Sequence, residues 1–278
     1  MTVDTEKYIE FVKGVTSDPS LDYAAFLTRT NSLELQEDCN VTQLLTAALG
    51  LTAESGEFTE VVKKIIFHPK VLPSIVIADP ELTVGMPKFI TAGTGLDAFA
   101  HCVEAYSSPH YHPMSQGIAL EGMRLVTTYL PRAYATPDDL EARAHMMSAA
   151  AMGATAFQKG LGAIHAMSHP VGAVFNTHHG TTNAVCMPAV LAFNADAIRG
   201  RFDQAAAYLG IDGGFDGFCE FVQQFNDSFA IPRTLTEMGV SADRLDDLVA
   251  MALEDPSCGG NPVELTADGL CGLFRACF

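Results

Sequence analysis

After Pro87 the chain carries an almost continuous helical pattern, and this feature limits its fold more than any other. Apolar residues recur there at spacings of three and four, which is the periodicity of helices that bury one face. The periodic stretches are 88–107, 114–130, 138–158, 160–174, 180–194, 203–209, 214–229, 241–254 and 266–277. Glycine and proline clusters such as CGGNP (258–262) separate them. The pattern predicts an α-helical domain over residues 80–278.

The sequence before Pro87 adds little β-structure to this picture. SIVIAD (74–79) is β-branched and bounded by prolines, so it predicts one short strand. Residues 42–67 again show helical spacing. The two Gly-Gly pairs stand between predicted helices and not after strands, so neither predicts a phosphate-binding loop. A mainly α fold is therefore expected.

Charge and cysteine content limit which binding partners and which cellular compartment we expect for this protein. Acidic side chains number 33 against 16 basic ones, and the net charge of −17 argues against nucleic acid and anionic membranes as partners. Seven scattered cysteines without a CxxC pair are typical of free thiols in a reducing compartment. The sequence shows neither a secretory signal nor an apolar run of about 18–20 residues. These features predict a cytoplasmic protein that is not bound to a membrane.

Histidines and one aspartate form the most suggestive polar pattern. Four of the nine histidines fall within 165–179. His165 and His169 are spaced i, i+4 and share a helix face, as do Asp97 and His101 upstream. His179 follows a turn-like segment. Side chains one helical turn apart can converge on a single ion.

This set of groups suits particular metals. One carboxylate with three imidazoles favours Fe²⁺ or Zn²⁺ over Mg²⁺ or Ca²⁺, which prefer oxygen ligands. Three or four protein ligands would also leave a position for a substrate oxygen. The alternative interpretation is that these histidines are hydrogen-bonded residues of a helical core, without a metal.

Longer motifs connect these residues to a known family. The motifs are VIADPELTVGMP (76–87), TAGTGLDAFAHCVEAY (91–106), KGLGAIHAMSHPVGAVFNTHHGTTNAVCMPAV (159–190) and GGNPVELT (259–266). With them, residues 67–278, about three quarters of the chain, resemble the C-terminal helical domain of iron-containing (group III) alcohol dehydrogenases, which has a dehydroquinate synthase-like fold.

The resemblance implies a role for each of the polar residues. It implies metal ligands at Asp97, His101, His165 and His179. It places His169 near the substrate as a candidate proton relay, a task that suits an imidazole. Thr83 falls in a segment that borders the nicotinamide nucleotide in the family. His178 matches a variable position and is left out of the site.

The function implied is that of a metal-dependent oxidoreductase, which transfers hydride between a small alcohol or aldehyde and NAD(P). Family members carry an α/β nucleotide-binding domain with a glycine-rich phosphate loop ahead of the helical domain, and this sequence shows no counterpart of it. We therefore expect weakened NAD(P) binding and impaired turnover. Apolar surface that such a domain would cover predicts self-association.

Residues 1–66 form a separate segment with a different resemblance. LLTAALGLTAESGEFTEVVKKIIF is similar to the first catalytic helix of MazG-type nucleoside triphosphate pyrophosphohydrolases. Glu54 and Glu57 have the i, i+3 spacing of that family's ExxE motif, which binds Mg²⁺ together with a later ExxD helix. The ExxD helix has no counterpart here. Two further hypotheses are thus a chimeric, non-catalytic metal-binding helical protein and a pyrophosphohydrolase fragment.

Overall fold

The computed structural model describes residues 78–278, which belong to one compact unit. Within that range the chain forms helices and turns without a strand, which confirms the predicted helical domain. Most of the predicted strand 74–79 lies outside the described residues, and its last two residues, Ala78 and Asp79, are not in a strand. Residues 1–66, with Glu54 and Glu57, also lie outside them.

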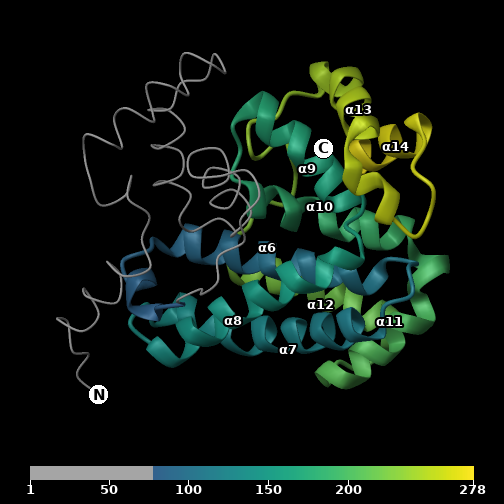
Figure 1. Cartoon of the computed structure of the whole chain (residues 1–278). Coiled ribbons are helices and arrows are strands. Elements are labelled where there is room, and N and C mark those ends of the chain that lie inside the picture. Colours follow the sequence, from purple (N-terminus) through teal and green to yellow (C-terminus); the bar gives the residue numbers. More distant parts are fainter. Residues whose placement is uncertain (1–77) are drawn as a thin grey trace, which may run out of the picture. The chain divides into compact units, whose positions relative to one another are not determined.

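The α-helices follow one another with short connections and four 3₁₀ turns among the described residues (Figure 1). In chain order the elements are η1 (Pro80–Thr83), α6 (Lys88–Ser107), α7 (Pro113–Ala135), α8 (Leu140–Ala156), η2 (Phe157–Lys159), α9 (Ala163–Phe175), α10 (His179–Phe193), α11 (Ala195–Leu209), α12 (Gly214–Ser228), η3 (Ala242–Arg244), α13 (Leu245–Glu254), η4 (Pro256–Gly260) and α14 (Ala267–Cys277).

Most predicted stretches match these helices to within a few residues. The clearest difference is α11, which begins at Ala195 although its pattern predicts a start at 203. Its first turns carry charged residues, while Ile198 and Phe202 are buried one turn apart. Two buried residues among charged ones give too weak a periodicity to mark the helix start.

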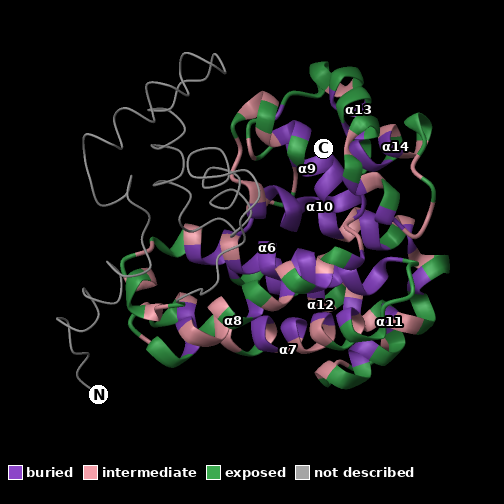
Figure 2. Ribbon diagram, viewed as in Figure 1, coloured by how far each residue is buried: buried purple, intermediate pink, exposed green. Residues whose placement is uncertain are grey.

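Helix α6 lies at the centre of the domain. It packs against α7 and α8 on one side and against α10 on the other (Figure 1). All residues from Gly95 to Ser107 are buried, so this part of the helix has no solvent face (Figure 2). Glycines permit this packing: a Cβ at Gly95 would lie 2.4 Å from the Leu130 side chain, and one at Gly153 would lie 3.0 Å from that of His101.

The carboxyl end of α6 is held by two cations from other elements. Lys159 donates hydrogen bonds to the carbonyls of Ala105 and Ser108, at 2.9 and 2.6 Å. Arg201 donates to the Ser108 carbonyl at 2.7 Å. Positive charge at a helix C-terminus satisfies its free carbonyls and interacts favourably with the helix dipole. These contacts fix the helix that carries much of the site described below.

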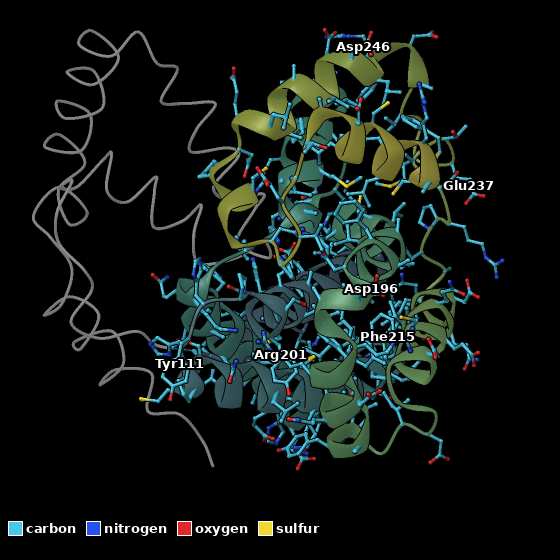
Figure 3. The ribbon with its side chains drawn as sticks, turned by 90° about the vertical axis from the view of Figure 1, so that its right-hand side faces the viewer. Tyr111, Asp196, Arg201, Phe215, Glu237 and Asp246 are labelled. Atoms are coloured by element: carbon cyan, nitrogen blue, oxygen red, sulfur yellow. The ribbon has the colours of Figure 1, made fainter. Side chains whose placement is uncertain are left out.

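The outer surface differs from this centre. Acidic side chains such as Glu237 and Asp246 are exposed at the periphery (Figure 3). None of the helices within residues 78–278 is long and apolar enough to cross a lipid bilayer. Helix α6, in contrast, carries polar side chains into the interior. Burying such groups costs free energy unless they have hydrogen-bond or ionic partners.

Candidate metal centre

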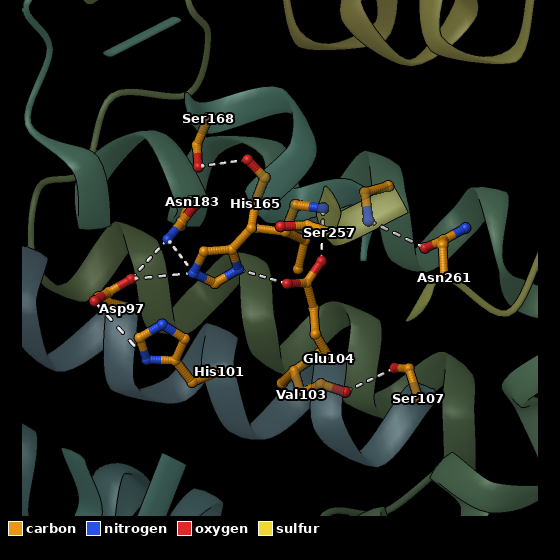
Figure 4. Close-up of polar contacts among 12 residues, drawn as sticks. Asp97, His101, Val103, Glu104, Ser107, His165, Ser168, Asn183, Ser257 and Asn261 are labelled. Atoms are coloured by element: carbon orange, nitrogen blue, oxygen red, sulfur yellow. Dashed lines mark hydrogen bonds and ion pairs between the residues drawn. The ribbon is translucent and has the colours of Figure 1, made fainter. Parts of the chain in front are cut away.

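Asp97 and His101 enter the interior together on α6. They lie one turn apart and are only 5% and 4% exposed. The Asp97 Oδ2 atom lies 3.9 Å from His101 Nδ1 (Figure 4). A carboxylate and an imidazole on the same buried helix face provide two ligands whose separation is fixed by helix geometry.

His165 from α9 and His179 from α10 complete the cluster. The Nε2 atoms of His165 and His179 lie 3.6 and 3.3 Å from Asp97 Oδ1. The rings of His101 and His165 are stacked, with centroids 4.6 Å apart. The structure thus brings together the four residues that the sequence nominates as ligands.

Close approach of α10 to α6 depends on Gly180, the residue after His179. A Cβ at this position would lie 2.1 Å from the carbonyl oxygen of Gly93 and 2.9 Å from the Asp97 Cβ. Any side chain would therefore push the start of α10 away from α6. The glycine lets His179 face Asp97.

The spacing of the ligand atoms fits a single ion. One ligand atom from each of Asp97, His101 and His165 lies within 4.8 Å of the others. Atoms that bind one Zn²⁺ or Fe²⁺ ion at about 2.0–2.2 Å are up to roughly 4 Å apart, so a small adjustment brings all of them into range. The residues present therefore fit a divalent transition metal.

Electrostatics in the cluster support the same conclusion. Burial raises the pKa of Asp97, but His101, His165 and His179 outweigh it and hold this pKa well below its usual range. Burial lowers the pKa of His101 to about 4 although Asp97 opposes it, which leaves a neutral imidazole with a lone pair. Burial would also lower the pKa of His165, but Glu104 and Asp97 raise it to about 10. The field at this point favours positive charge, which a cation would supply.

Glu104 is a site residue that the sequence analysis missed. Its Oε2 atom lies 2.5 Å from His165 Nδ1, and its Oε1 atom accepts the backbone N–H of Ile164 at 2.7 Å (Figure 4). It lies three residues after His101 and seven after Asp97, so all three share one face of α6. This spacing was the available signal, but its partner lies 61 residues away in sequence.

Asn183 also was not predicted. Its Nδ2 atom donates to Asp97 Oδ1 at 2.7 Å and faces the Nε2 atoms of His165 and His179 at 3.3 and 3.0 Å. Its Oδ1 atom is buried and has no hydrogen-bond partner among the described residues. Acceptor atoms of Asp97, His165 and His179 thus gather around one amide group, which fits a site for a cation.

His169 lies at the outer edge of the cluster, with 43% of its side chain exposed. Its ring stacks on that of His179, with centroids 5.4 Å apart. Its Nδ1 atom lies 2.7 Å from Asp255 Oδ2, and Asp255 in turn accepts the Ser257 N–H at 2.8 Å. Burial lowers the pKa of His169, although Asp255 opposes that shift. Asp255, too, was missed from sequence.

Two other predicted positions lie on the margin. Thr83 is in η1, and its hydroxyl donates to the Pro80 carbonyl at 2.8 Å. Its role toward a nucleotide stays a prediction. His178 precedes α10 and accepts the Thr181 N–H at 3.3 Å, while its ring packs so closely on Gly93 that a Cβ there would lie 2.3 Å from Cε1. The exclusion of His178 from the ligand set stays a prediction.

Comparison with known proteins identifies the family. Residues 91–278 match the C-terminal domain of the Fe-containing alcohol dehydrogenase family. The chain belongs to this family. Over 215 residues it is 41% identical to a 4-hydroxybutyrate dehydrogenase of Cupriavidus necator, covering 74% of this chain and 56% of that protein. Over 222 residues it is 36% identical to an NAD-dependent methanol dehydrogenase of Bacillus methanolicus, covering 77% and 58%.

Solved structures in the Fe-containing alcohol dehydrogenase family share the fold. A crystal structure of 1,3-propanediol oxidoreductase matches with a TM-score of 0.72 at 32% identity, over 74% of this chain and 56% of that one. An iron-containing alcohol dehydrogenase from Thermococcus thioreducens matches with a TM-score of 0.69 at 31% identity, over 74% and 55%. The chain spans just over half the length of these relatives.

Proposed function

We propose that this domain binds one Fe²⁺ or Zn²⁺ ion and forms the metal-binding half of an oxidoreductase that acts between a small alcohol or aldehyde and NAD(P). The proposed ligands are Asp97, His101, His165 and His179. The observation that carries the proposal is the convergence of side chains from α6, α9 and α10 on the buried carboxylate of Asp97. Relatives named for dehydrogenation of 4-hydroxybutyrate and methanol support the reaction class.

A bound divalent cation would polarise the substrate oxygen and favour its deprotonated form. The chain's own residues would prepare and orient this site. Asp97 stays ionised and His101 stays neutral, so both offer lone pairs at physiological pH. Glu104 contacts His165 at Nδ1, the ring nitrogen that does not face Asp97, and restricts rotation of the ring, while Asn183 donates a hydrogen bond to Asp97 Oδ1.

His169 is the proposed catalytic residue for proton movement. With Asp255 bound to Nδ1, its Nε2 atom is left to accept the proton of an alcohol or to return it to an aldehyde. Its partial exposure gives that proton a route to solvent. Thr83 is the proposed contact to the nicotinamide nucleotide.

A second candidate function is metal binding without catalysis. It is favoured by the site itself, since all four proposed ligands come from helices α6, α9 and α10 of the described domain. In this case the domain would hold its ion while NAD(P) binding and turnover are weak or lost. The pyrophosphohydrolase hypothesis depends on Glu54 and Glu57 and stays a prediction outside the described residues.

Metal content tests the first part of the proposal. Elemental analysis of the purified full chain should find about one Fe²⁺ or Zn²⁺ ion per chain. Asp97→Asn should lose most of it, because an amide replaces the central carboxylate. Asp216→Asn, which changes an exposed aspartate on α12, should keep it. Equal metal content in wild type and Asp97→Asn would contradict the site.

Titration of the metal-loaded chain with NADH separates the two candidates. Saturable NADH binding, followed by fluorescence, together with aldehyde-dependent NADH oxidation would support the oxidoreductase. Metal binding without either would support the non-catalytic protein. The same assay with His169→Ala should show reduced turnover at unchanged metal content if His169 moves the proton.

A further inference from the structure

The N-terminus of α9 is capped by side chains from distant parts of the chain. The residue that precedes the helix, Gly162, offers no side chain to its first free N–H groups. Instead, Asn261 Oδ1 accepts the Ala163 N–H at 3.2 Å, and Glu104 Oε1 accepts the Ile164 N–H at 2.7 Å (Figure 4). The helix that carries His165 is therefore positioned from outside.

Gly162 makes room for this arrangement. A Cβ at Gly162 would lie 2.9 Å from Asn261 Oδ1 and 3.1 Å from Glu104 Oε1. Both contacts are tighter than a side chain normally makes, so a larger residue would crowd the two acceptors. The free N–H groups at the start of α9 are therefore capped by residues that are distant in the sequence.

Glu104 differs from Asn261 in what its second oxygen does. While Oε1 binds the backbone, Oε2 lies 2.5 Å from His165 Nδ1. A carboxylate held at both oxygens cannot rotate away from either partner. Because it only accepts hydrogen bonds, it requires a proton on Nδ1 of the imidazole. The Nε2 atom, on the side of Asp97 and Asn183, is then the one left to bind an ion.

Asn261 has no such contact with the imidazole. It forms a reciprocal amide pair with Asn194, with both N···O distances at 2.9 Å, and donates to the Val263 carbonyl at 2.7 Å. It therefore supports the same helix end as Glu104 without acting on the tautomer of His165. A substitution at Asn261 is therefore a control for a purely structural role of the cap.

We propose that Glu104 is a positioning residue for metal binding, which places the proton of His165 on Nδ1 and directs the Nε2 lone pair toward Asp97. The inference rests on the proposed metal function. It gives Glu104 a role beyond capping α9, since the carboxylate selects which nitrogen can bind the ion.

Glu104→Gln tests this role with little change in shape. The amide oxygen can still accept the Ile164 N–H, but its NH₂ group then faces His165 Nδ1 and requires a lone pair there. In the opposite amide orientation, the new NH₂ group would face the Ile164 N–H, so that two hydrogen-bond donors would oppose each other. The proton of His165 is thus moved to Nε2, and Zn²⁺ affinity of the full chain should fall about 10–100-fold. Glu121→Gln, on the surface of α7, is the matched control and should bind like wild type.

Asn261→Ala provides the opposite pattern. It removes a cap and leaves Asn194 without its amide partner, so the melting temperature of the metal-free chain should fall more than in Glu104→Gln. Its Zn²⁺ affinity should change less than that of Glu104→Gln. If the two variants instead lose affinity in proportion to their loss of stability, Glu104 is only a structural cap and the inference is wrong.

The tautomer of His165 can also be tested in the wild-type chain, so that the test does not depend on the folding of a variant. In the Zn²⁺-loaded protein, ¹H–¹⁵N spectra of the imidazoles should show His165 protonated at Nδ1 and metal-bound at Nε2. Zinc bound at Nδ1 would overturn the inference while leaving the proposed function intact. Failure of the wild type to bind Zn²⁺ would instead refute the proposed function itself.

Discussion

His165 and His169 lie one turn apart on α9, and each presents its Nδ1 atom to a carboxylate, yet they differ in burial. The side chain of His165 is 1% exposed and that of His169 is 43% exposed. His165 faces two carboxylates, which overcome burial and raise its pKa to about 10. His169 has one carboxylate partner, and burial with two neighbouring histidines lowers its pKa.

The comparison teaches that a hydrogen bond to a carboxylate does not by itself define what a histidine does. The inner histidine, His165, is buried beside Asp97 and is shielded from solvent, which suits a ligand. The outer one is stacked on His179 but reaches solvent, which suits proton transfer. Three experiments test this distinction between the two histidines.

The largest effect is expected from exchanging each histidine for alanine. His165→Ala should lose most of the bound Fe²⁺ or Zn²⁺, because it removes a ligand from the buried set. His169→Ala should keep its metal. Elemental analysis of both variants after identical metal loading checks this, with the exposed His110→Ala as control. Similar losses in both variants would show that the two positions do not have separate roles.

A smaller effect is expected from substitution of Gly180, the glycine that allows α10 to approach α6 and His179 to face Asp97. Gly180→Ala should lower the free energy of unfolding by about 1–3 kcal/mol, since the new methyl group overlaps the α6 backbone. Gly172→Ala, on α9 with no atom near its Cβ position, should be neutral or stabilise by about 0.5–1 kcal/mol. Urea unfolding of the metal-free chains measures both. A neutral Gly180→Ala would contradict the close contact of α6 and α10.

The smallest effect concerns the outer histidine and its dependence on pH. Hydrogen bonds from Ser257 and His169 outweigh burial and lower the pKa of Asp255. A carboxyl with a lowered folded-state pKa stabilises above its unfolded pKa of about 3.9, and this contribution is lost as pH falls through the folded value. Asp255→Asn should therefore cost about 1 kcal/mol or less at pH 7, because solvent screens this partly exposed pair.

The pH dependence provides the check on that variant. The difference in unfolding free energy between wild type and Asp255→Asn should shrink below about pH 4, as the carboxyl becomes protonated and resembles the amide. Urea unfolding at pH 7 and at several values below pH 4 measures it. A difference that grows on acidification would contradict the assigned direction of the pKa shift.

Local features of this protein could be predicted from its amino-acid sequence alone. Helical periodicity predicted the domain after Pro87, because the repeat of a helix is a property of neighbouring residues. The i, i+4 spacings of Asp97 with His101 and of His165 with His169 likewise placed each pair on one helix face. The motifs around them predicted the family to which the chain belongs.

Tertiary structure decided which of these groups meet and which face solvent. Glu104 reaches His165 across 61 residues of sequence, and Asp255 reaches His169 across 86, so no local pattern could pair them. Spacing could not separate His165 from His169 either, because burial depends on how α9 packs against α6 and α10. Helix formation is set by short-range geometry, whereas the burial of one histidine and the exposure of the next depend on packing between segments that are far apart in the chain.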